Sequence, residues 1–340
     1  MGVKLTEIIP RKELQWDELK AKTIAIDTPN VLYQFLSSIR KPDGTLLTDS
    51  KGNVTSHLVG LFPRTIRLME LGIKPVFVFD GKPPLLKKQE IERRRGLKEK
   101  ANEKFEIAKE EGNEEEMLKY SRQSVKLTKD MIKEAQELIS AFGLPVIQAP
   151  SEAEAQASLI CRNADAWAVA SQDYDALVYG TPKVIQNLTL AEKRKLPNGS
   201  YVKVYPVMIE LKEALASLNI NQEQLLLLSV LVGTDFNPGG VKGIGPKKAL
   251  KLVMEKSIPE IEKEIEKMGA DFDLNEIMDV FRQMPVSSDY NLEFNNFDEE
   301  RIRKILIDKH QFSVERVESG FEQLKKQKEE KKQTSLFNFK

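Results

Sequence analysis

The fold is decided by the stretch Val76-Phe77-Val78-Phe79-Asp80, a short apolar run that ends in an acid. Two further runs end in the same way: Thr23-Ile24-Ala25-Ile26 leads into Asp27, and the segment 166–170 leads through Ser171-Gln172 into Asp173. Each run is short, apolar throughout and rich in residues that favour strands, which is typical of central strands buried on both faces. We therefore expect three buried strands, each followed by an acid.

Helical stretches separate these runs, at 31–39, 57–71 and 126–142. Alternation of this kind favours an α/β fold with a largely parallel sheet. Ligands of such sheets bind beyond the carboxyl ends of the strands, so the three acids mark a candidate site for a geometric reason. A fourth acid, Asp235, follows the Leu-rich helix predicted at 222–232 and has a similar position.

The composition excludes several classes of function. The 340 residues include no apolar run long enough to span a bilayer and no secretory leader, so we expect no membrane partner and no secretion. Cys161 is the only cysteine, and His57 and His310 are the only histidines, which disfavours a disulfide, a zinc centre and a Ser-His-Asp triad. The 52 basic and 52 acidic residues cancel, so DNA binding would depend on local basic patches.

Two further pairs of acids have local explanations as well as functional ones. In Ser151-Glu152-Ala153-Glu154, a capping box at a helix start would account for Glu154 but leaves Glu152 unexplained. In Asp173-Tyr174-Asp175, the first aspartate has the alternative role of capping the helix that follows. Both explanations weaken when the pairs are taken together, because both pairs follow segments expected to converge on one sheet edge.

Seven acids are therefore candidates for one site, namely Asp27, Asp80, Glu152, Glu154, Asp173, Asp175 and Asp235. Seven unpaired anions would raise one another's pKa values or open the fold, and divalent cations resolve this conflict. All-oxygen ligation suits Mg²⁺ or Mn²⁺, and seven carboxylates exceed what one Mg²⁺ needs. Two ions about 4 Å apart would clamp the attacking and leaving oxygens of a phosphodiester. No P-loop is present, which disfavours an NTPase.

Three other segments bear on nucleic-acid or protein partners. The segment 82–129 is dense in charge, with a basic part at 87–104, and is expected to form one or two exposed helices; a solvated hairpin with internal ion pairs is the alternative. Gly243-Ile244-Gly245-Pro246 predicts a tight turn whose amides can hold a backbone phosphate, and a plain helix connector is the alternative. The tail 325–332 is expected to be disordered, followed by an apolar cluster suited to a partner.

At this point the motifs carry a family resemblance. The chain resembles the flap endonucleases of the archaeal and eukaryotic lineage, within the wider XPG/5′-nuclease family. The motifs are Phe79-Asp80-Gly81-Lys82-Pro83-Pro84, Ala149-Pro150-Ser151-Glu152-Ala153-Glu154-Ala155, Ser171-Gln172-Asp173-Tyr174-Asp175, and Gly233-Thr234-Asp235 leading to Gly243-Ile244-Gly245-Pro246-Lys247. Their order and spacing extend the resemblance over essentially the whole chain.

The resemblance implies a PIN/5′-nuclease-like architecture, with a largely parallel twisted central sheet, helices on both faces, a helical arch and a helix-hairpin-helix element. It implies a single nuclease domain at 1–325, with the arch inserted at about 82–130 and the hairpin element at about 222–256, then a flexible tail at 326–340. It also implies a Mg²⁺-dependent 5′ flap endonuclease with 5′–3′ exonuclease activity, acting on branched DNA in replication, Okazaki fragment processing and repair.

The resemblance assigns roles to individual residues. The seven acids match the two-metal carboxylates, and Lys87 and Arg94 match basic residues at the arch base that assist the scissile phosphate. The DNA contacts it implies are Gly2, Tyr33, Arg93, Lys98, Gly243, Gly245, Lys247 and Lys248. It associates a K⁺ ion with the hairpin element. Tyr33 has an ordinary alternative as part of a helix core.

The last residues resemble a motif that binds the sliding clamp (PCNA), with Gln333, Leu336 and Phe339 in register. Lys340 stands where the usual pattern has a second aromatic. The family implies a monomer located with the chromosome, in the cytoplasm or nucleoid of an archaeon or the nucleus of a eukaryote. Two alternatives remain open: a noncatalytic protein that binds DNA junctions, and a relative that prefers RNA or Holliday junctions.

Overall fold

The structure is a computed structural model that describes residues 3, 5–189, 193–195 and 200–337. Its centre is a seven-stranded sheet with the order β1-β9-β6-β5-β2-β3-β4. The parallel strands are β2 (Thr23–Asp27), β3 (Lys74–Phe79), β4 (Val146–Gln148), β5 (Ala168–Ala170) and β6 (Lys183–Gln186). Antiparallel pairing adds β9 (Val207–Glu210) and then β1 (Lys12–Glu13) at one edge, while β7 (Lys193–Lys195) and β8 (Tyr201–Lys203) pair separately.

The central strands are buried on both faces, as their apolar sequences predict. Ile26 and Phe77 belong to the core cluster shared with α1 (Thr28–Ser38), α2 (Ser56–Glu70) and α5 (Lys129–Ala141). Ala25 and Val76 face the other cluster, shared with α6 (Ala153–Arg162) and α9 (Gln222–Val232). Alternate residues of a strand point to opposite faces, so two helical layers can enclose one sheet. The predicted α/β fold with a largely parallel sheet is confirmed.

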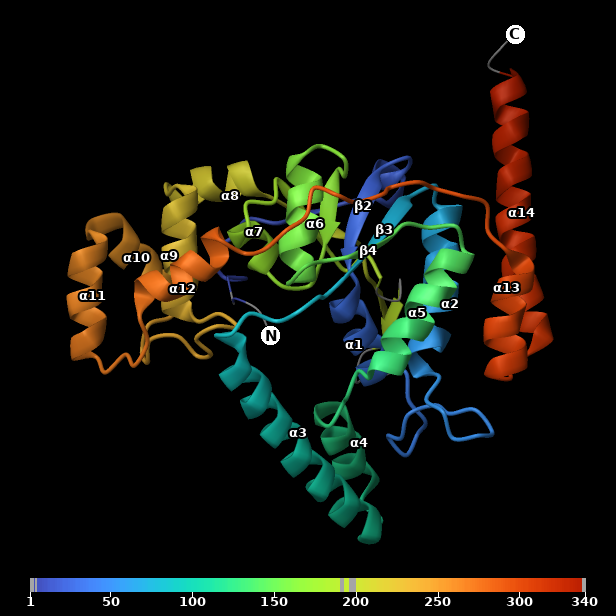
Figure 1. The fold of residues 1–340 in the computed structure, drawn as a ribbon, viewed down its shortest axis with the longest axis horizontal. Coiled ribbons are helices and arrows are strands. Elements are labelled where there is room, and N and C mark those ends of the chain that lie inside the picture. The colour runs from blue at the N-terminus through green and yellow to red at the C-terminus, as the bar shows by residue number, and fades with distance from the viewer. Residues whose placement is uncertain (1–2, 4, 190–192, 196–199, 338–340) are drawn as a thin grey trace.

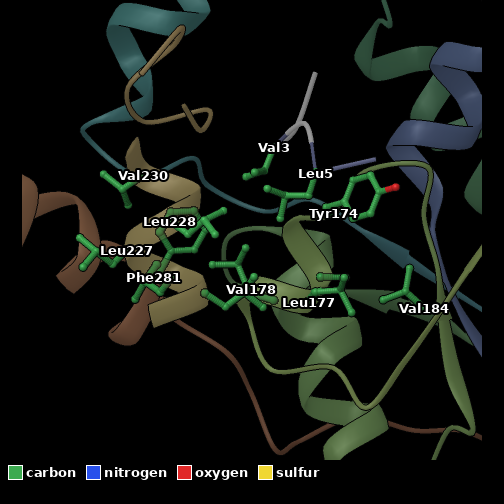
Figure 2. Packing of buried hydrophobic residues seen from close by; sticks show 14 of the residues in the cluster. Val3, Leu5, Tyr174, Leu177, Val178, Val184, Leu227, Leu228, Val230 and Phe281 are labelled. Atoms are coloured by element: carbon green, nitrogen blue, oxygen red, sulfur yellow. The ribbon is translucent and has the colours of Figure 1, made fainter. Parts of the chain in front are cut away.

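The remaining helices extend the two layers. On the α9 side lie α7 (Asp175–Val178), α8 (Leu211–Leu218), α10 (Pro246–Glu255), α11 (Ile258–Lys267) and α12 (Leu274–Arg282) (Figure 1). Leu177 and Val178 of α7 share an apolar cluster with Leu227 of α9 and Phe281 of α12 (Figure 2). The other side holds α13 (Glu299–Arg303), a π-helical turn at Lys304–Lys309 and α14 (Val314–Phe337), and a short 3₁₀ helix lies at Trp16–Leu19.

The charged segment after β3 forms two helices that project away from the body, α3 (Lys87–Glu110) and α4 (Glu114–Gln123) (Figure 1). They are held to each other by a small apolar cluster of Phe105, Ala108 and Met117. Most other side chains of α3 are exposed, which is consistent with the composition of this segment. The expectation of one or two inserted helices is confirmed, and the term arch is used below for α3 with α4.

The carboxyl-terminal helix differs from the predicted flexible tail. Helix α14 continues to Phe337, so the segment 326–337 is helical in the structure. Lys, Glu and Gln are strong helix formers, which explains why this polar composition can extend a helix that is already anchored by packing on α2.

Within the described ranges no single helix could cross a membrane, and only the bent pair of α8 and α9 would pass by length and composition together.

Candidate active site

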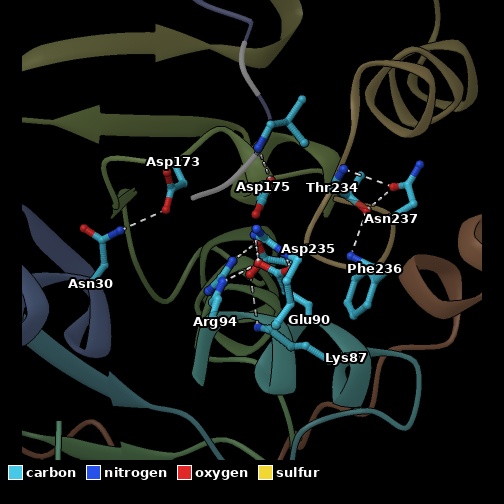
Figure 3. Close-up of polar contacts among 12 residues, drawn as sticks. Asn30, Lys87, Glu90, Arg94, Asp173, Asp175, Thr234, Asp235, Phe236 and Asn237 are labelled. Atoms are coloured by element: carbon cyan, nitrogen blue, oxygen red, sulfur yellow. Dashed lines mark hydrogen bonds and ion pairs between the residues drawn. The ribbon is translucent and has the colours of Figure 1, made fainter. Parts of the chain in front are cut away.

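All seven predicted acids lie at or beside the carboxyl ends of the parallel strands. Asp27 ends β2, Asp80 directly follows β3, and Asp173 follows β5. Glu152 and Glu154 stand at the start of α6, Asp175 begins α7, and Asp235 follows α9. Because the strands run parallel, these ends meet at one edge of the sheet. Figure 3 shows Asp173, Asp175 and Asp235 at this edge, opposite Lys87 and Arg94 of the arch.

The loops that carry Asp80 and Glu152 approach closely because the residue after Asp80 is a glycine. A Cβ atom built on Gly81 would lie 2.1 Å from the carbonyl oxygen of Ala149, so no larger residue fits without moving the backbone. The Gly81 amide donates to the carbonyl of Ser151 at 2.6 Å. The glycine of the Phe-Asp-Gly motif is therefore required by the close approach of the two loops.

The local alternatives for the acidic pairs do not hold. Ser151 does not cap α6, because its hydroxyl donates to the carbonyl of Lys82 at 2.9 Å and the N-cap position belongs to Glu152. Asp173 does not cap α7, whose N-cap position is Tyr174; instead its carboxylate accepts from Asn30 Nδ2 at 3.0 Å. The predicted capping box of Ser151 and Glu154 is therefore absent, and Asp173 is not a helix cap.

The acids act on one another electrostatically. Burial, followed by the charges of Asp80 and Asp173, raises the pKa of Asp27 well above its ordinary value. Burial, followed by three other acids, does the same to the pKa of Glu154. Burial also raises the pKa of Asp175 to about 7, with Asp173 and Asp235 adding to it. The seven acids thus form one electrostatic cluster rather than separate surface charges.

Within this cluster, one group of acids is held only by neutral donors. The Val3 amide donates to Asp175 at 2.9 Å, and the Ser171 hydroxyl lies 2.8 Å from Glu154 and 3.1 Å from Asp27. In the described part of the chain, no lysine, arginine or histidine side chain forms an ion pair with Asp27, Glu154, Asp173 or Asp175. These acids therefore carry the unfavourable electrostatics of the cluster, which protonation or a bound cation would relieve.

The other group faces cations from the base of the arch. Lys87 forms ion pairs with Glu152 and, at 3.4 Å, with Asp235. Arg94 Nη2 donates to Asp235 at 2.5 Å. Burial opposes the charge of Lys87, but Glu152 and Asp235 outweigh it and raise the pKa of this lysine, so Lys87 stays protonated.

The donor chemistry suits Mg²⁺ or Mn²⁺ and does not suit zinc. Every candidate ligand is a carboxylate oxygen, whereas both histidines lie elsewhere, beside Glu134. Among the described residues, no three acid, histidine or cysteine side chains are gathered as a closed set around a single point. Mg²⁺ usually binds one or two carboxylates directly and takes its other ligands from water, so a set of carboxylates that does not close around one point fits this ion.

A cavity of about 700 Å³ lies between α1 and the arch, and two of its lining residues, Asn30 and Arg94, donate hydrogen bonds to Asp173 and Asp235. Its lining includes Tyr33, which is 40% exposed, together with Asn30, Arg94 and Lys98. The Lys98 ammonium lies 4.9 Å from the centre of the Tyr33 ring. The structure thus places Tyr33 on the wall of a cavity and not in the core, which was its ordinary alternative.

The predicted hairpin turn is present at the start of α10. Gly243 has a φ of +81°, a conformation that favours glycine, and Gly245 is the N-cap of α10 without a side-chain cap. Lys247 and Lys248 are exposed in its first turn. Free amides and exposed lysines at a helix start suit an anion. Binding of a backbone phosphate at this turn stays a prediction.

Some predicted residues cannot be placed. Gly2 and Phe339 lie outside the described residues; Gln333 and Leu336 lie in the helical backbone of α14, where side chains are not described. Conversely, sequence reasoning missed Glu90, Asn30 and Ser171. Glu90 precedes Arg93 and Arg94 by three and four positions, a helical pairing signal that was available. Asn30 and Ser171 carried no such signal, because only the tertiary structure brings them to the acids.

This fold with its acid-lined sheet edge belongs to the XPG class: the family model of the XPG N-terminal domain matches residues 1–101, and that of the XPG I-region matches residues 143–235. Flap endonuclease 1 of Pyrococcus abyssi is 49% identical over 337 residues, covering 99% of this chain and 97% of that protein. Flap endonuclease 1 of Saccharolobus solfataricus is 47% identical over 332 residues, covering 96% and 95%. The chain therefore belongs to the flap endonuclease 1 family.

Solved structures agree with this assignment. Flap endonuclease-1 from Methanococcus jannaschii superposes with a TM-score of 0.76 at 40% identity, covering 97% of this chain and 100% of that one. The catalytic core of Rad2 in complex with DNA substrate has a TM-score of 0.71 at 23% identity, covering 95% and 100%. The second likeness concerns the fold alone.

Proposed function

We propose that this protein is a structure-specific 5′ flap endonuclease with 5′–3′ exonuclease activity, which cuts branched DNA in replication, Okazaki fragment processing and repair. The observation that carries the proposal is the meeting of seven carboxylates at one sheet edge with two arch cations, Lys87 and Arg94. Membership of the flap endonuclease 1 family supports the choice of substrate.

The proposed reaction depends on Mg²⁺, for which Mn²⁺ can substitute. The ligands would be Asp27, Asp80, Glu152, Glu154, Asp173, Asp175 and Asp235. Two bound ions would activate water and neutralise the charge that develops on the phosphodiester oxygens. The raised pKa values of Asp27, Glu154 and Asp175 support this, because acids whose charge is opposed first by burial and then by neighbouring acids gain most from a divalent cation.

Lys87 and Arg94 would contact the scissile phosphate. Both cations already lie on acids of the site, so a phosphate bound among them would be within reach of short side-chain movements. An ammonium and a guanidinium held beside a phosphate stabilise the negative charge that the transition state develops. Because Lys87 stays protonated, its role is electrostatic and not that of a base.

DNA would be positioned by contacts on both sides of the acids. Tyr33 can stack on a base in the cavity below the arch, with Lys98 and Arg93 near the backbone of the flap. Gly2 would lie near the cut site. On the other side, the duplex would rest on the hairpin element through Gly243, Gly245, Lys247 and Lys248, with K⁺ associated there.

The sliding clamp is a proposed partner. Gln333, Leu336 and Phe339 form the expected motif, with Lys340 in place of a second aromatic. We propose that the nuclease itself acts as a monomer and that this tail recruits it to the clamp. A fluorescent peptide of residues 326–340 should bind the clamp, and a Leu336→Ala peptide should bind at least about 10-fold more weakly, since a buried anchor is lost.

A panel of DNA substrates tests the function directly. The wild-type protein should cut a 5′ flap with Mg²⁺, should be inactive with EDTA, and should cut bubble, four-way and RNA-flap substrates more slowly. Preferential cutting of the four-way or RNA substrate would favour a relative with other specificity. Tight flap binding without product, in either Mg²⁺ or Mn²⁺, would instead favour a noncatalytic junction binder.

A further inference from the structure

Glu90 is a buried acid outside the seven and lies one helical turn after Lys87 in α3. Its side chain is only 2% exposed, although α3 is otherwise largely exposed. Figure 3 shows it beside Lys87, Arg94 and Asp235, where the arch meets the acid cluster. A carboxylate buried at this place must have partners that offset its loss of hydration.

The partners are two consecutive arginines. Arg93 donates through Nε at 2.5 Å and Nη2 at 2.8 Å, and Arg94 donates through Nε at 2.5 Å. Burial opposes the charge of Glu90, but Arg93 and Arg94 outweigh it and lower the pKa of this carboxyl. Glu90 therefore remains an anion and holds two cations at the base of the arch.

Arg94 is shared between two carboxylates. Its Nε donates to Glu90 and its Nη2 donates to Asp235, both at 2.5 Å. A guanidinium offers further N–H donors in a rigid fork, and Arg94 also lines the cavity that contains Tyr33. The contact with Glu90 occupies one side of this fork, so Arg94 cannot present that side to Asp235.

We propose that Glu90 is a positioning residue that sets the orientation of Arg94 for the reaction; this rests on the proposed nuclease function. Without the Glu90 charge, Arg94 Nε is free to join Nη2 in a side-on grip on Asp235, with the two parallel hydrogen bonds that an arginine and a carboxylate favour. That grip would withdraw Arg94 from a phosphate and neutralise an acid needed at the site. Glu90 prevents this side-on grip by holding Nε.

The alternative is that Glu90 only anchors the arch. The two roles differ in what they predict for rate and for binding. An anchoring role predicts weaker binding of DNA when Glu90 is changed, because the arch would loosen. A positioning role predicts a slower chemical step while binding is kept or even strengthened, because the change removes a negative charge from a basic surface.

The test is single-turnover cleavage of a 5′-flap DNA by Glu90→Gln, with enzyme in excess, alongside the equilibrium Kd for the same DNA in Ca²⁺. We expect the rate to fall by about 10- to 100-fold, the range for losing a hydrogen bond to a charged group. The Kd should stay within about 3-fold of wild type or become tighter. Glu90→Asp, which keeps the charge on a shorter side chain, should recover part of the rate.

Two double-mutant cycles identify the partner through which Glu90 acts. Combined with Arg94→Ala, Glu90→Gln should slow cleavage no further, whereas combined with Arg93→Ala its effect should persist in full. Glu99→Gln is the matched control, since Glu99 pairs with Arg95 at 2.9 Å on the same helix but is exposed and should keep the wild-type rate.

Three results would overturn the inference. Glu90→Gln could cut as fast as the wild type, it could multiply the defect of Arg94→Ala, or it could weaken binding at an unchanged saturating rate. Each of these leaves the proposed nuclease function standing, because the wild type still cuts the flap. A wild-type protein that releases no product would overturn the nuclease function and this inference together.

Discussion

Two regions of this molecule bury carboxylates, and they treat them in opposite ways. At the sheet edge, Asp27, Glu154 and Asp175 are buried with raised pKa values. Behind α2 and α5, Glu134 accepts from His57 at 3.2 Å and from His310 at 3.1 Å, and Lys309 lies 2.8 Å away. There, burial opposes the charge, but the three partners outweigh it and lower the pKa of Glu134 to about 2.

The second region is called the histidine cluster here and comprises His57, His310, Glu134, Asp49 and Lys309. His310 also contacts Asp49 at 3.2 Å, which ties the loop before α2 to the segment before α14. In this cluster both acids have lysine or imidazole partners, from which we expect a role in stabilising the fold. The sheet edge holds acids without an ion pair among the described side chains, an arrangement that costs stability and that the proposed cations would relieve. Burial of an acid alone does not distinguish a functional site from a structural one. The distinction lies in whether the protein places a basic side chain beside the buried acid.

The largest expected effect breaks the sheet edge. Asp175→Asn keeps the shape of the side chain and an acceptor for the Val3 amide, but removes a charge expected to bind metal. Cleavage of a 5′ flap should fall by at least about 1,000-fold, which corresponds to several kcal/mol of lost transition-state stabilisation. The variant should melt no lower than the wild type. Near-normal cleavage would remove Asp175 from the site.

The corresponding substitution in the histidine cluster, Glu134→Gln, should lower the free energy of unfolding and leave the cleavage rate unchanged. Glu134→Gln leaves two buried histidines and Lys309 without their shared anion, so the free energy of unfolding should fall by about 2–4 kcal/mol. Urea denaturation at pH 7 measures this. Single-turnover cleavage at 25 °C should stay within about 2-fold of wild type, because the cluster lies away from the acids. An unchanged free energy of unfolding would contradict the view that Glu134 and its partners stabilise the fold.

The pH dependence of stability sharpens the contrast. Burial lowers the pKa of His57 below its ordinary 6.5, so its contribution is present above that pH and is lost as the pH falls below it. The depressed pKa of Glu134 adds a second loss as the pH falls from about 4.5 to about 2. The raised pKa values of Asp27, Glu154 and Asp175 act with the opposite sign and add stability as the pH falls, so the cluster is measured from the difference in unfolding free energy between wild type and Glu134→Gln. That difference should shrink as the pH falls below about 4.5, and a difference that stays constant down to about pH 3 would refute the assignment.

Much of the fold and most of the candidate site could be predicted because their signals are local. An apolar run such as Val76–Phe79 predicts a buried strand. Because ligands of parallel sheets bind beyond the carboxyl ends of the strands, an acid directly after such a run is predicted to lie at the site. The candidate acids at α6 and α7 needed the family motif, since helix capping was a fair alternative for Glu154 and for Asp173. The structure removed that ambiguity by giving Ser151 and Asp173 other partners.

What could not be predicted depends on pairs far apart in sequence. His57 and His310 served only to argue against zinc, yet they meet on Glu134 across more than half the chain. Glu90 was passed over within a charged segment because composition does not reveal which acid will be buried. The tail 326–337 was expected to be flexible from its polarity, although the same residues favour helix once α14 is anchored.

The smallest effect concerns Mg²⁺ and the melting temperature. An ion that binds only the folded protein stabilises it by mass action, by about 1.4 kcal/mol at a concentration of about 10 times its Kd. Mg²⁺ should therefore raise the melting temperature of the wild type by a few degrees at constant ionic strength, and it should do so less for Asp175→Asn. Glu134→Gln should melt at a lower temperature than the wild type. Its gain in melting temperature from Mg²⁺ should equal that of the wild type, because the substitution lies in the histidine cluster and removes no proposed metal ligand. An equal gain in Asp175→Asn would show that Mg²⁺ acts elsewhere, and the contrast between the two buried acid regions would then no longer explain where the ion binds.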